Sequence, residues 1–202
     1  MEPAGIACIV MAAGASSRFG GDKLAAQLGG RSLLRRALEA VPPGLFSAVA
    51  VVTARPEGAA LCRTFGFTLV PNHAPEAGVS RTIRLGLDAA GPCAGALFLV
   101  SDQPLLRRET VERLVSAWQA QPEYIVCAAH DGARGNPCLF PARFFPELRA
   151  LTGDTGGGAV IRAHPESVRA VELPAAELLD ADTPQALAEL ERLYQAHRAT
   201  DA

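Results

Sequence analysis

The residue types best suited to chemistry gather in one loop near the start of the 202-residue chain. Residues 12–17 are small, and two cations follow them at Arg18 and Lys23. Small residues let backbone N–H groups approach a ligand closely, and successive N–H groups in such a loop form a concave site for anions. With the two positive charges, this composition predicts a cradle for a triphosphate; the alternative is a structural glycine-rich turn with solvated charges. The predicted contacts are Ala12, Ala13, Gly14, Ala15, Ser16, Ser17, Arg18 and Lys23.

An α/β fold is predicted to position this loop. Short runs that are nearly continuous in Val, Ile, Leu, Ala and Cys are typical of buried strands, and they cover residues 6–11, 48–53, 67–71, 96–100 and 124–129. Helical patterns separate them at residues 34–41, 56–65, 79–87 and 111–118. This alternation predicts a doubly wound, mostly parallel sheet in a Rossmann-like, three-layer α/β/α arrangement. The loop then lies at the carboxyl edge of the sheet, where such folds bind ligands.

The C-terminal third has a looser pattern. We expect a short strand at 138–140, a glycine-rich loop at 152–158 in which Asp154 caps the next helix, and another strand at 168–173. Thr183 and Pro184 have the residue types of an N-cap and a first helical position, so a last helix begins there. With no linker or repeat, the chain is predicted to form one domain over residues 1–196, with a flexible tail at 197–202.

Charge and composition exclude several classes of function. With 19 Lys and Arg against 21 Asp and Glu, the net charge of −2 does not suit a nucleic-acid coat or a membrane-surface protein. The aromatic share of 5% is too small for a base-stacking platform. No apolar run approaches the roughly 20 residues that cross a bilayer, and Glu2 with no basic residue precedes the first apolar run, unlike a signal peptide. We therefore expect a soluble cytoplasmic protein that binds neither nucleic acid nor membrane.

The loop sequence can be compared with known phosphate cradles. A Walker loop needs G-x-x-x-x-G-K-[ST], but Phe19 stands five residues after Gly14, and Leu24 follows Lys23. The Rossmann fingerprint G-x-G-x-x-G also fails, because Ser16 replaces its second glycine. The loop does match A-A-G-x-S-x-R-[MF]-G-x-x-K, and it therefore resembles the signature of the MobA-like NTP transferases, a family that includes the cofactor cytidylyltransferases.

Further segments extend the resemblance over nearly the whole chain. Residues 78–87 are similar to the family segment G-M-S-x-S-L-x-x-G-L, which lines the nucleobase pocket; this implies contacts from Gly78 and Ser80. Ser80 also suits a helix N-cap, which is its alternative role. Residues 180–184 resemble the family's D-I-D-T-P segment.

The resemblance implies a divalent cation, Mg²⁺ with Mn²⁺ as the alternative, held against the nucleotide phosphates. Asp102 is the first expected ligand, since hard cations prefer carboxylate oxygens at such a strand end; its alternative role is a cap for the following turn. Asp180 and Asp182 both qualify as the second ligand, because residues two apart in an extended segment point the same way. We favour Asp182, whose alternative role is to complement the helix dipole beside Thr183.

The reaction that the resemblance implies is transfer of an NMP group, in which an acceptor oxyanion attacks the α-phosphorus of an NTP and pyrophosphate leaves. Lys23, Arg18 and Asp102 are the expected catalytic residues, because such a reaction depends on positioning and charge stabilisation. Ala13 stands where the family's guanylyltransferases have glycine. Its methyl group narrows the space through which the base or the phosphates approach the loop, so we expect CTP over GTP. The chain is closest to the molybdenum cofactor cytidylyltransferases, which implies molybdopterin as acceptor and a molybdoenzyme maturation protein as a further partner.

Two departures from the family pattern leave the acceptor open. Asn136 stands where the cofactor cytidylyltransferases usually have His, and Gly158 replaces the Arg of the segment G-D-x-G-A-R. The alternatives are transfer from GTP, transfer to another acceptor such as a sugar phosphate, or a protein that binds and delivers a nucleotide or cofactor without turnover. A Rossmann oxidoreductase is disfavoured because its fingerprint is missing.

Overall fold

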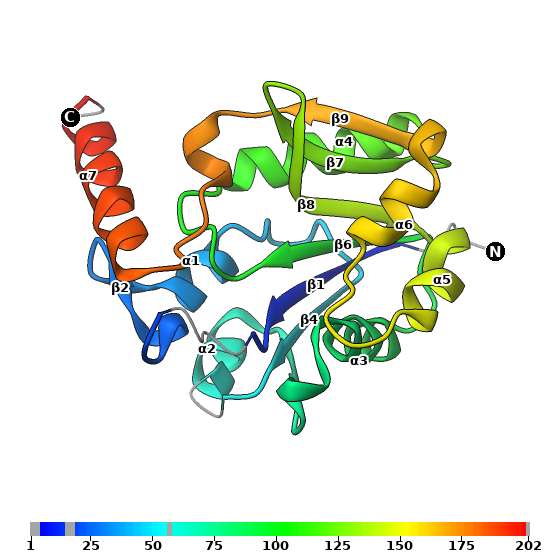
Figure 1. Cartoon of the computed structure of the whole chain (residues 1–202), viewed down its shortest axis with the longest axis horizontal. Coiled ribbons are helices and arrows are strands. Elements are labelled where there is room, and N and C mark those ends of the chain that lie inside the picture. Colours follow the sequence, from blue (N-terminus) through cyan, green and yellow to red (C-terminus); the bar gives the residue numbers. More distant parts are fainter. Residues whose placement is uncertain (1–4, 15–18, 56–57, 201–202) are drawn as a thin grey trace.

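The computed structural model describes residues 5–14, 19–55 and 58–200 (Figure 1). Seven strands form one sheet in the order β5-β4-β1-β6-β8-β7-β9, and β2 pairs with β3 in a separate small sheet. The strands are β1 (Ile6–Ala12), β2 (Gln27–Leu28), β3 (Arg31–Ser32), β4 (Ala48–Thr53), β5 (Thr68–Pro71), β6 (Gly95–Val100), β7 (Ile125–His130), β8 (Ala133–Pro141) and β9 (Val168–Glu172).

The main sheet is mostly parallel, as predicted. Four of its strand pairs are parallel, and only β8 runs antiparallel, against both β6 and β7. From β1 the chain winds outward through β4 and β5, then returns to β6 on the other side of β1. The winding direction therefore reverses between β1 and β6, and the carboxyl ends of these two strands frame the crevice where doubly wound folds bind ligands.

Helices cover both faces of the sheet, which confirms the three-layer prediction. One apolar core lies under α1 (Leu33–Glu39), α2 (Gly58–Phe65) and α4 (Arg108–Ala120). The opposite core lies under α3 (Val79–Ala90), α5 (Phe145–Ala150) and α6 (Gly158–Ala163). The last helix, α7 (Pro184–Thr200), stands beside β2 and away from the main sheet, as Figure 1 shows. No helix among the described residues is long and apolar enough to span a membrane.

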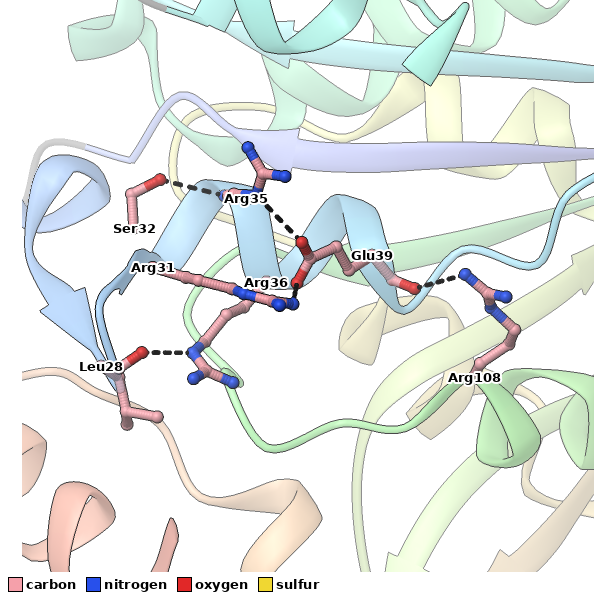
Figure 2. Close-up of polar contacts among 7 residues, drawn as sticks. All are labelled: Leu28, Arg31, Ser32, Arg35, Arg36, Glu39 and Arg108. Atoms are coloured by element: carbon pink, nitrogen blue, oxygen red, sulfur yellow. Dashed lines mark hydrogen bonds and ion pairs between the residues drawn. The ribbon is translucent and has the colours of Figure 1, made fainter. Parts of the chain in front are cut away.

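Polar contacts join α1 to its neighbours (Figure 2). The Glu39 carboxylate accepts hydrogen bonds from Arg31 at 2.8 Å and from Arg35 at 2.9 Å, and the Glu39 carbonyl accepts one from Arg108 in α4 at 3.3 Å. Arg36 donates to the Leu28 carbonyl of β2 at 2.7 Å. These contacts attach the small β2–β3 sheet to α1. In the sequence, this sheet comes directly after the segment that carries Lys23.

Several local expectations are corrected by the structure. Asp154 does not cap α6, whose first turn has Gly157 at the cap position and no side-chain cap bond. Ser80 is not an N-cap either, because α3 begins at Val79 with Gly78 as the cap. The strand expected at 138–140 extends over the whole of β8, because β8 is paired on both sides.

The last helix begins as predicted, since Thr183 Oγ1 accepts a hydrogen bond from the Ala186 amide at 3.1 Å. Its backbone remains helical to Thr200, so helix occupies most of the stretch expected as a tail; residues 201–202 lie outside the described part of the chain. Pro56, the expected start of α2, also lies outside it.

Candidate functional site

A cavity of about 350 Å³ opens at the point where the winding of the sheet reverses. Residues at the ends of β1 and β6 and just beyond them line it, together with residues that precede and begin α3. This volume lies within the range of small-ligand sites in proteins. The cavity is lined by Met11, Ala13, Gly14, Lys23, Leu24, Pro75, Gly78, Val79, Thr82, Val100, Ser101, Asp102, Asp154 and Asp182.

Three charged side chains meet in this cavity. The Lys23 ammonium donates to the carboxylate of Asp102 and to that of Asp182, each at 2.7 Å. The Lys23 side chain is only 8% exposed, whereas the side chains of Asp102 and Asp182 are 26% and 31% exposed. Burial lowers the pKa of Lys23, but the hydrogen bonds and charges of the two carboxylates outweigh it and raise that pKa above its usual value. Lys23 therefore carries its positive charge at neutral pH.

A short 3₁₀ turn at Lys23–Ala25 fixes the backbone of Lys23. Asp22 caps this turn, accepting hydrogen bonds from the amides of Leu24 at 3.1 Å and Ala25 at 3.4 Å. An ion pair with Arg55, just beyond β4, holds the same Asp22 oxygen at 3.2 Å. The segment after β1 is thus tied to the end of the neighbouring strand.

The two carboxylates are positioned by backbone hydrogen bonds. Asp102 lies two residues beyond the end of β6, and its carbonyl accepts a hydrogen bond from the Ala181 amide at 2.8 Å. That bond places the segment before α7 against the end of β6, so Asp182 faces Asp102 across the Lys23 ammonium. The neighbouring Ser101 hydroxyl donates to the Met11 carbonyl of β1 at 3.0 Å, which joins the two strand ends.

Asp180 occupies a different position from Asp182. Desolvation raises the pKa of the Asp180 carboxyl, repulsion from Asp102 raises it further, and a hydrogen bond with Gln103 lowers it. Lys23 donates to Asp182 and not to Asp180. Of the two carboxylates that the sequence left open, Asp182 is the one that shares a cation with Asp102.

The predicted nucleotide contacts divide into three groups. Ala13, Gly14 and Gly78 line the cavity, as do Lys23, Asp102 and Asp182. Ala12 is the buried last residue of β1, and Ser80 is fully buried inside α3 with its hydroxyl unpaired, so neither lines the cavity. The remaining predicted contacts, Ala15, Ser16, Ser17 and Arg18, lie outside the described residues.

Asp154 lines the cavity, although its sequence context predicted a helix cap. The Ser80 amide donates to the Gly153 carbonyl at 3.1 Å, and a Cβ on Gly78 would collide with the Gly153 backbone. Gly78, with φ of +88°, therefore allows the 152–158 loop to pack against the start of α3. This packing brings Asp154 to the cavity wall. In the sequence, the only hint of it is a glycine in each of two distant segments, Gly78 and Gly153.

A second cavity of about 180 Å³ lies next to the first and shares Met11, Val79 and Val100 with it. Its remaining lining is mainly apolar, with Asn136 as the polar side chain and the backbone of the glycine-rich loop along one side. The two positions that depart from the family pattern, Asn136 and Gly158, both line this cavity. It is lined by Met11, Val79, Ile83, Phe98, Val100, Asn136, Cys138, Phe140, Leu148, Gly156, Gly157, Gly158 and Ile161.

Comparison with known sequences confirms the predicted family. The family model of the MobA-like NTP transferase domain matches residues 8–168. The chain is 28% identical over 195 residues to the purine catabolism protein PucB of Bacillus subtilis, across 88% of this chain and 91% of PucB. It is 27% identical over 147 residues to the molybdenum cofactor guanylyltransferase of Rhizobium meliloti, across 70% of this chain and 66% of that protein.

Solved structures share the fold. A nucleotidyl transferase of Methanothermobacter, Mth528, superposes with a TM-score of 0.80 at 20% identity, over 96% of this chain and 99% of that one. Rv0371C of Mycobacterium tuberculosis in complex with manganese gives 0.75 at 22% identity, over 93% and 98%. A CMP:2-keto-3-deoxy-manno-octonic acid synthetase complexed with CTP gives 0.68 at 13% identity, over 95% and 98%.

Proposed function

The chain belongs to the MobA-like NTP transferase family, and from this premise we propose that it transfers CMP from CTP to the phosphate of molybdopterin, releasing pyrophosphate. Membership of this family makes it a nucleotidyltransferase that uses a nucleoside triphosphate. The observation that carries the proposal is the convergence of Lys23, Asp102 and Asp182 in the cavity beside Ala13 and Gly14. A triphosphate needs such a combination of fixed positive charge, backbone donors and acidic groups for a cation.

The chain's own residues would act through charge and position. Backbone amides after β1 would receive the β- and γ-phosphates, and Arg18 would fork onto their oxygens. Lys23 would neutralise the charge that develops at the α-phosphate while the pyrophosphate leaves. The reaction needs no covalent intermediate with the protein, so these roles account for the chemistry that the protein must supply.

The pair Asp102 and Asp182 fits a hard divalent cation, because an oxygen of each lies 2.7 Å from the same positive charge. Among the described residues, no three His, Cys, Asp or Glu side chains are grouped to hold a metal by themselves. The remaining ligands would therefore be phosphate oxygens and water, a combination typical of Mg²⁺ and open to Mn²⁺. When bound, the cation would withdraw charge from the phosphates.

The choice of CTP rests on Ala13. Ala13 lines the cavity next to Gly14, and its methyl group would take up space that a glycine would leave to a larger purine. GTP is the second candidate, and the similarity to a guanylyltransferase is the observation that favours it.

The second cavity supports an acceptor with a flat ring face and a phosphate. It adjoins the nucleotide cavity through Met11, Val79 and Val100, so a molecule seated in it would reach the α-phosphate. The tricyclic pterin of molybdopterin has a flat ring face that could pack on the apolar side chains, and Asn136 offers an amide to one of the polar groups on its edge. A sugar phosphate, as the alternative acceptor, would find few polar partners here.

Pyrophosphate release tests this proposal. The purified protein is incubated with CTP, GTP, ATP or UTP and Mg²⁺ or Mn²⁺, together with molybdopterin, with sugar phosphates or with no acceptor. We expect release with CTP that depends on molybdopterin. Release with GTP alone would contradict the role given to Ala13. Release only with sugar phosphates would show that the acceptor is a sugar phosphate and not molybdopterin. Binding of NTP without release under any condition would favour a delivery protein.

A further inference from the structure

We propose that the Lys23 ammonium and a divalent cation occupy the same place between Asp102 and Asp182 in turn, so that the cation releases Lys23 toward the nucleotide phosphates. The inference rests on the proposed function in one respect, namely that phosphates receive the released ammonium. Its basis is that Lys23 is paired with both carboxylates, whereas the proposed reaction needs its ammonium at the nucleotide phosphates in the same cavity.

Charge at the site favours a divalent cation over the ammonium. One positive charge of Lys23 faces the two negative charges of Asp102 and Asp182, and the Asp180 carboxyl lies near enough to repel Asp102. A cation of charge +2 at the same place would attract both carboxylates more strongly than an ammonium of charge +1 does.

The geometry suits an exchange at one position. Both carboxylate oxygens lie 2.7 Å from the ammonium nitrogen. Mg²⁺ binds oxygens at about 2.1 Å, so each carboxylate would need to move by only about 0.6 Å to bind a cation at that place. An ammonium and a metal ion cannot share the place, because two cations at such a separation repel strongly in a partly buried site.

Only the side chain of Lys23 needs to move. Its backbone is held by the cap from Asp22, which accepts from the amides of Leu24 and Ala25. The flexible four-carbon stem can move the ammonium from the carboxylates toward the part of the same cavity that Ala13 and Gly14 line. An ammonium has three N–H donors, and the contacts with Asp102 and Asp182 occupy two of them, so release is needed for more than one bond to phosphate.

The composition of the chain supplies a direct readout. Lys23 is the only lysine in the 202 residues; every other basic side chain apart from histidine is an arginine. An amine-acylating ester therefore reports on this one side chain, measured on the Lys23 peptide by mass spectrometry. The rate in guanidinium chloride gives the value for a fully accessible Lys23.

We expect slow acylation of Lys23 without divalent cations and an increase of about tenfold or more on adding Mn²⁺ at constant ionic strength. CTP added with Mn²⁺ should slow acylation again, because the phosphates take up the ammonium. NaCl at the same ionic strength is the control for simple screening. If Mn²⁺ binds, seen as loss of the free-ion EPR signal, and Lys23 acylation stays the same, the proposal is wrong.

Metal affinity gives the reciprocal test. Without nucleotide, Lys23→Gln should bind Mn²⁺ about tenfold more tightly than the wild type, because no ammonium has to be displaced. Arg107→Gln is the matched control: it removes an exposed positive charge whose ion pair is with Glu177 and not with either carboxylate, and we expect a change below about twofold. Equal affinity in Lys23→Gln and the wild type, or no binding in either, would overturn the proposal.

These outcomes separate the exchange from the proposed reaction. Pyrophosphate release by the wild type with unchanged acylation would refute the exchange and leave the transferase intact. Acylation that responds to Mn²⁺ without pyrophosphate release from any NTP would refute the reaction and leave the cation site.

Discussion

At the scale of single residues, the Lys23 ammonium joins segments that lie far apart in the sequence. Its two carboxylate partners are 79 and 159 residues away, and both contacts are 2.7 Å long. Charge-assisted hydrogen bonds of this length are strong because both groups are ionised. The same three side chains line the cavity that we assign to the triphosphate, so their removal should affect turnover far more than folding.

Replacing Lys23 or Asp102 by alanine tests that assignment. We expect Lys23→Ala and Asp102→Ala each to lower the rate of pyrophosphate release by about 100-fold or more, since each removes a charge placed for the transition state. Circular dichroism should show an unchanged fold, because the backbone bond from the Ala181 amide to Asp102 does not need the side chain. Full activity in both variants would refute the site.

Single residues also show how far the sequence could locate the site, although the roles of these residues stay predictions. Lys23, Asp102 and Asp182 could be selected because their spacing matches a known pattern, and the structure brings them into contact. The choice between Asp180 and Asp182 stayed open, because it depends on the bond between the Ala181 amide and the Asp102 carbonyl, which no local pattern encodes. Asp154 was assigned to a cap for the same reason: its place depends on packing between two glycine segments.

At the scale of elements, a buried carboxylate ties the segment before α7 to α4. Glu177 is 5% exposed and accepts hydrogen bonds from the Arg107 amide at 3.0 Å and the Thr110 hydroxyl at 2.6 Å. It thus supplies, from a distant segment, the cap that α4 lacks locally. The same segment carries Asp182 to the site.

Glu177→Ala should lower the free energy of unfolding by about 1–3 kcal/mol, because it leaves buried donors unpaired. Urea denaturation measures the change. Glu112→Gln, an exposed position in the same helix, should stay within about 0.5 kcal/mol of the wild type. Equal effects of the two substitutions would show that Glu177 is not a cap.

The ion pairs of Glu39 predict a pH dependence. Burial raises the pKa of Glu39, but hydrogen bonds from Arg31 and Arg35 outweigh it and hold the pKa below its usual value. Because the folded-state pKa is lowered, this stabilisation is present above the unfolded-state pKa and is lost as the pH falls through the folded value. Glu39→Gln should therefore be less stable than the wild type at pH 7, by under about 1 kcal/mol for such exposed pairs. The difference should shrink and vanish as the pH falls through the folded-state pKa of Glu39, and a difference that grew on acidification would contradict this account.

The elements differ in how far the sequence could predict them. The five strands expected in the first 130 residues are present within a residue or two, because continuous apolar runs are distinctive of strands covered on both faces. The β2–β3 sheet and the turn at Lys23–Ala25 were not predicted, since each is too short to show a period. The extent of β8 was missed because pairing with β6 and β7, and not its own sequence of Gly and Pro, makes it a strand.

At the scale of the whole molecule, the net charge of −2 is an average over a local contrast. The winding of the sheet gathers Lys23, Asp102 and Asp182 at one edge. A small polyanion with its cation is the ligand that such an edge suits, although the chain as a whole does not favour polyanions.

Ligand binding should therefore stabilise the whole fold. With CTP and Mg²⁺ at about 100 times the dissociation constant, the unfolding free energy should rise by about 2.7 kcal/mol. For a chain of this size that corresponds to a rise in Tm of about 5–10 °C, measured by differential scanning calorimetry. GTP at the same concentration should give a smaller shift; an equal or larger one would contradict the argument from Ala13.

The measurement that tests the central claim most directly follows the label from CTP. Two parallel reactions contain the protein, Mg²⁺ and molybdopterin, with CTP labelled with ³²P at the α-phosphate in one and at the γ-phosphate in the other. Nucleotidyl transfer predicts that the α-label joins the molybdopterin product and the γ-label leaves in pyrophosphate. Label from the γ-phosphate in the acceptor, or in free phosphate while CDP accumulates, would contradict the account.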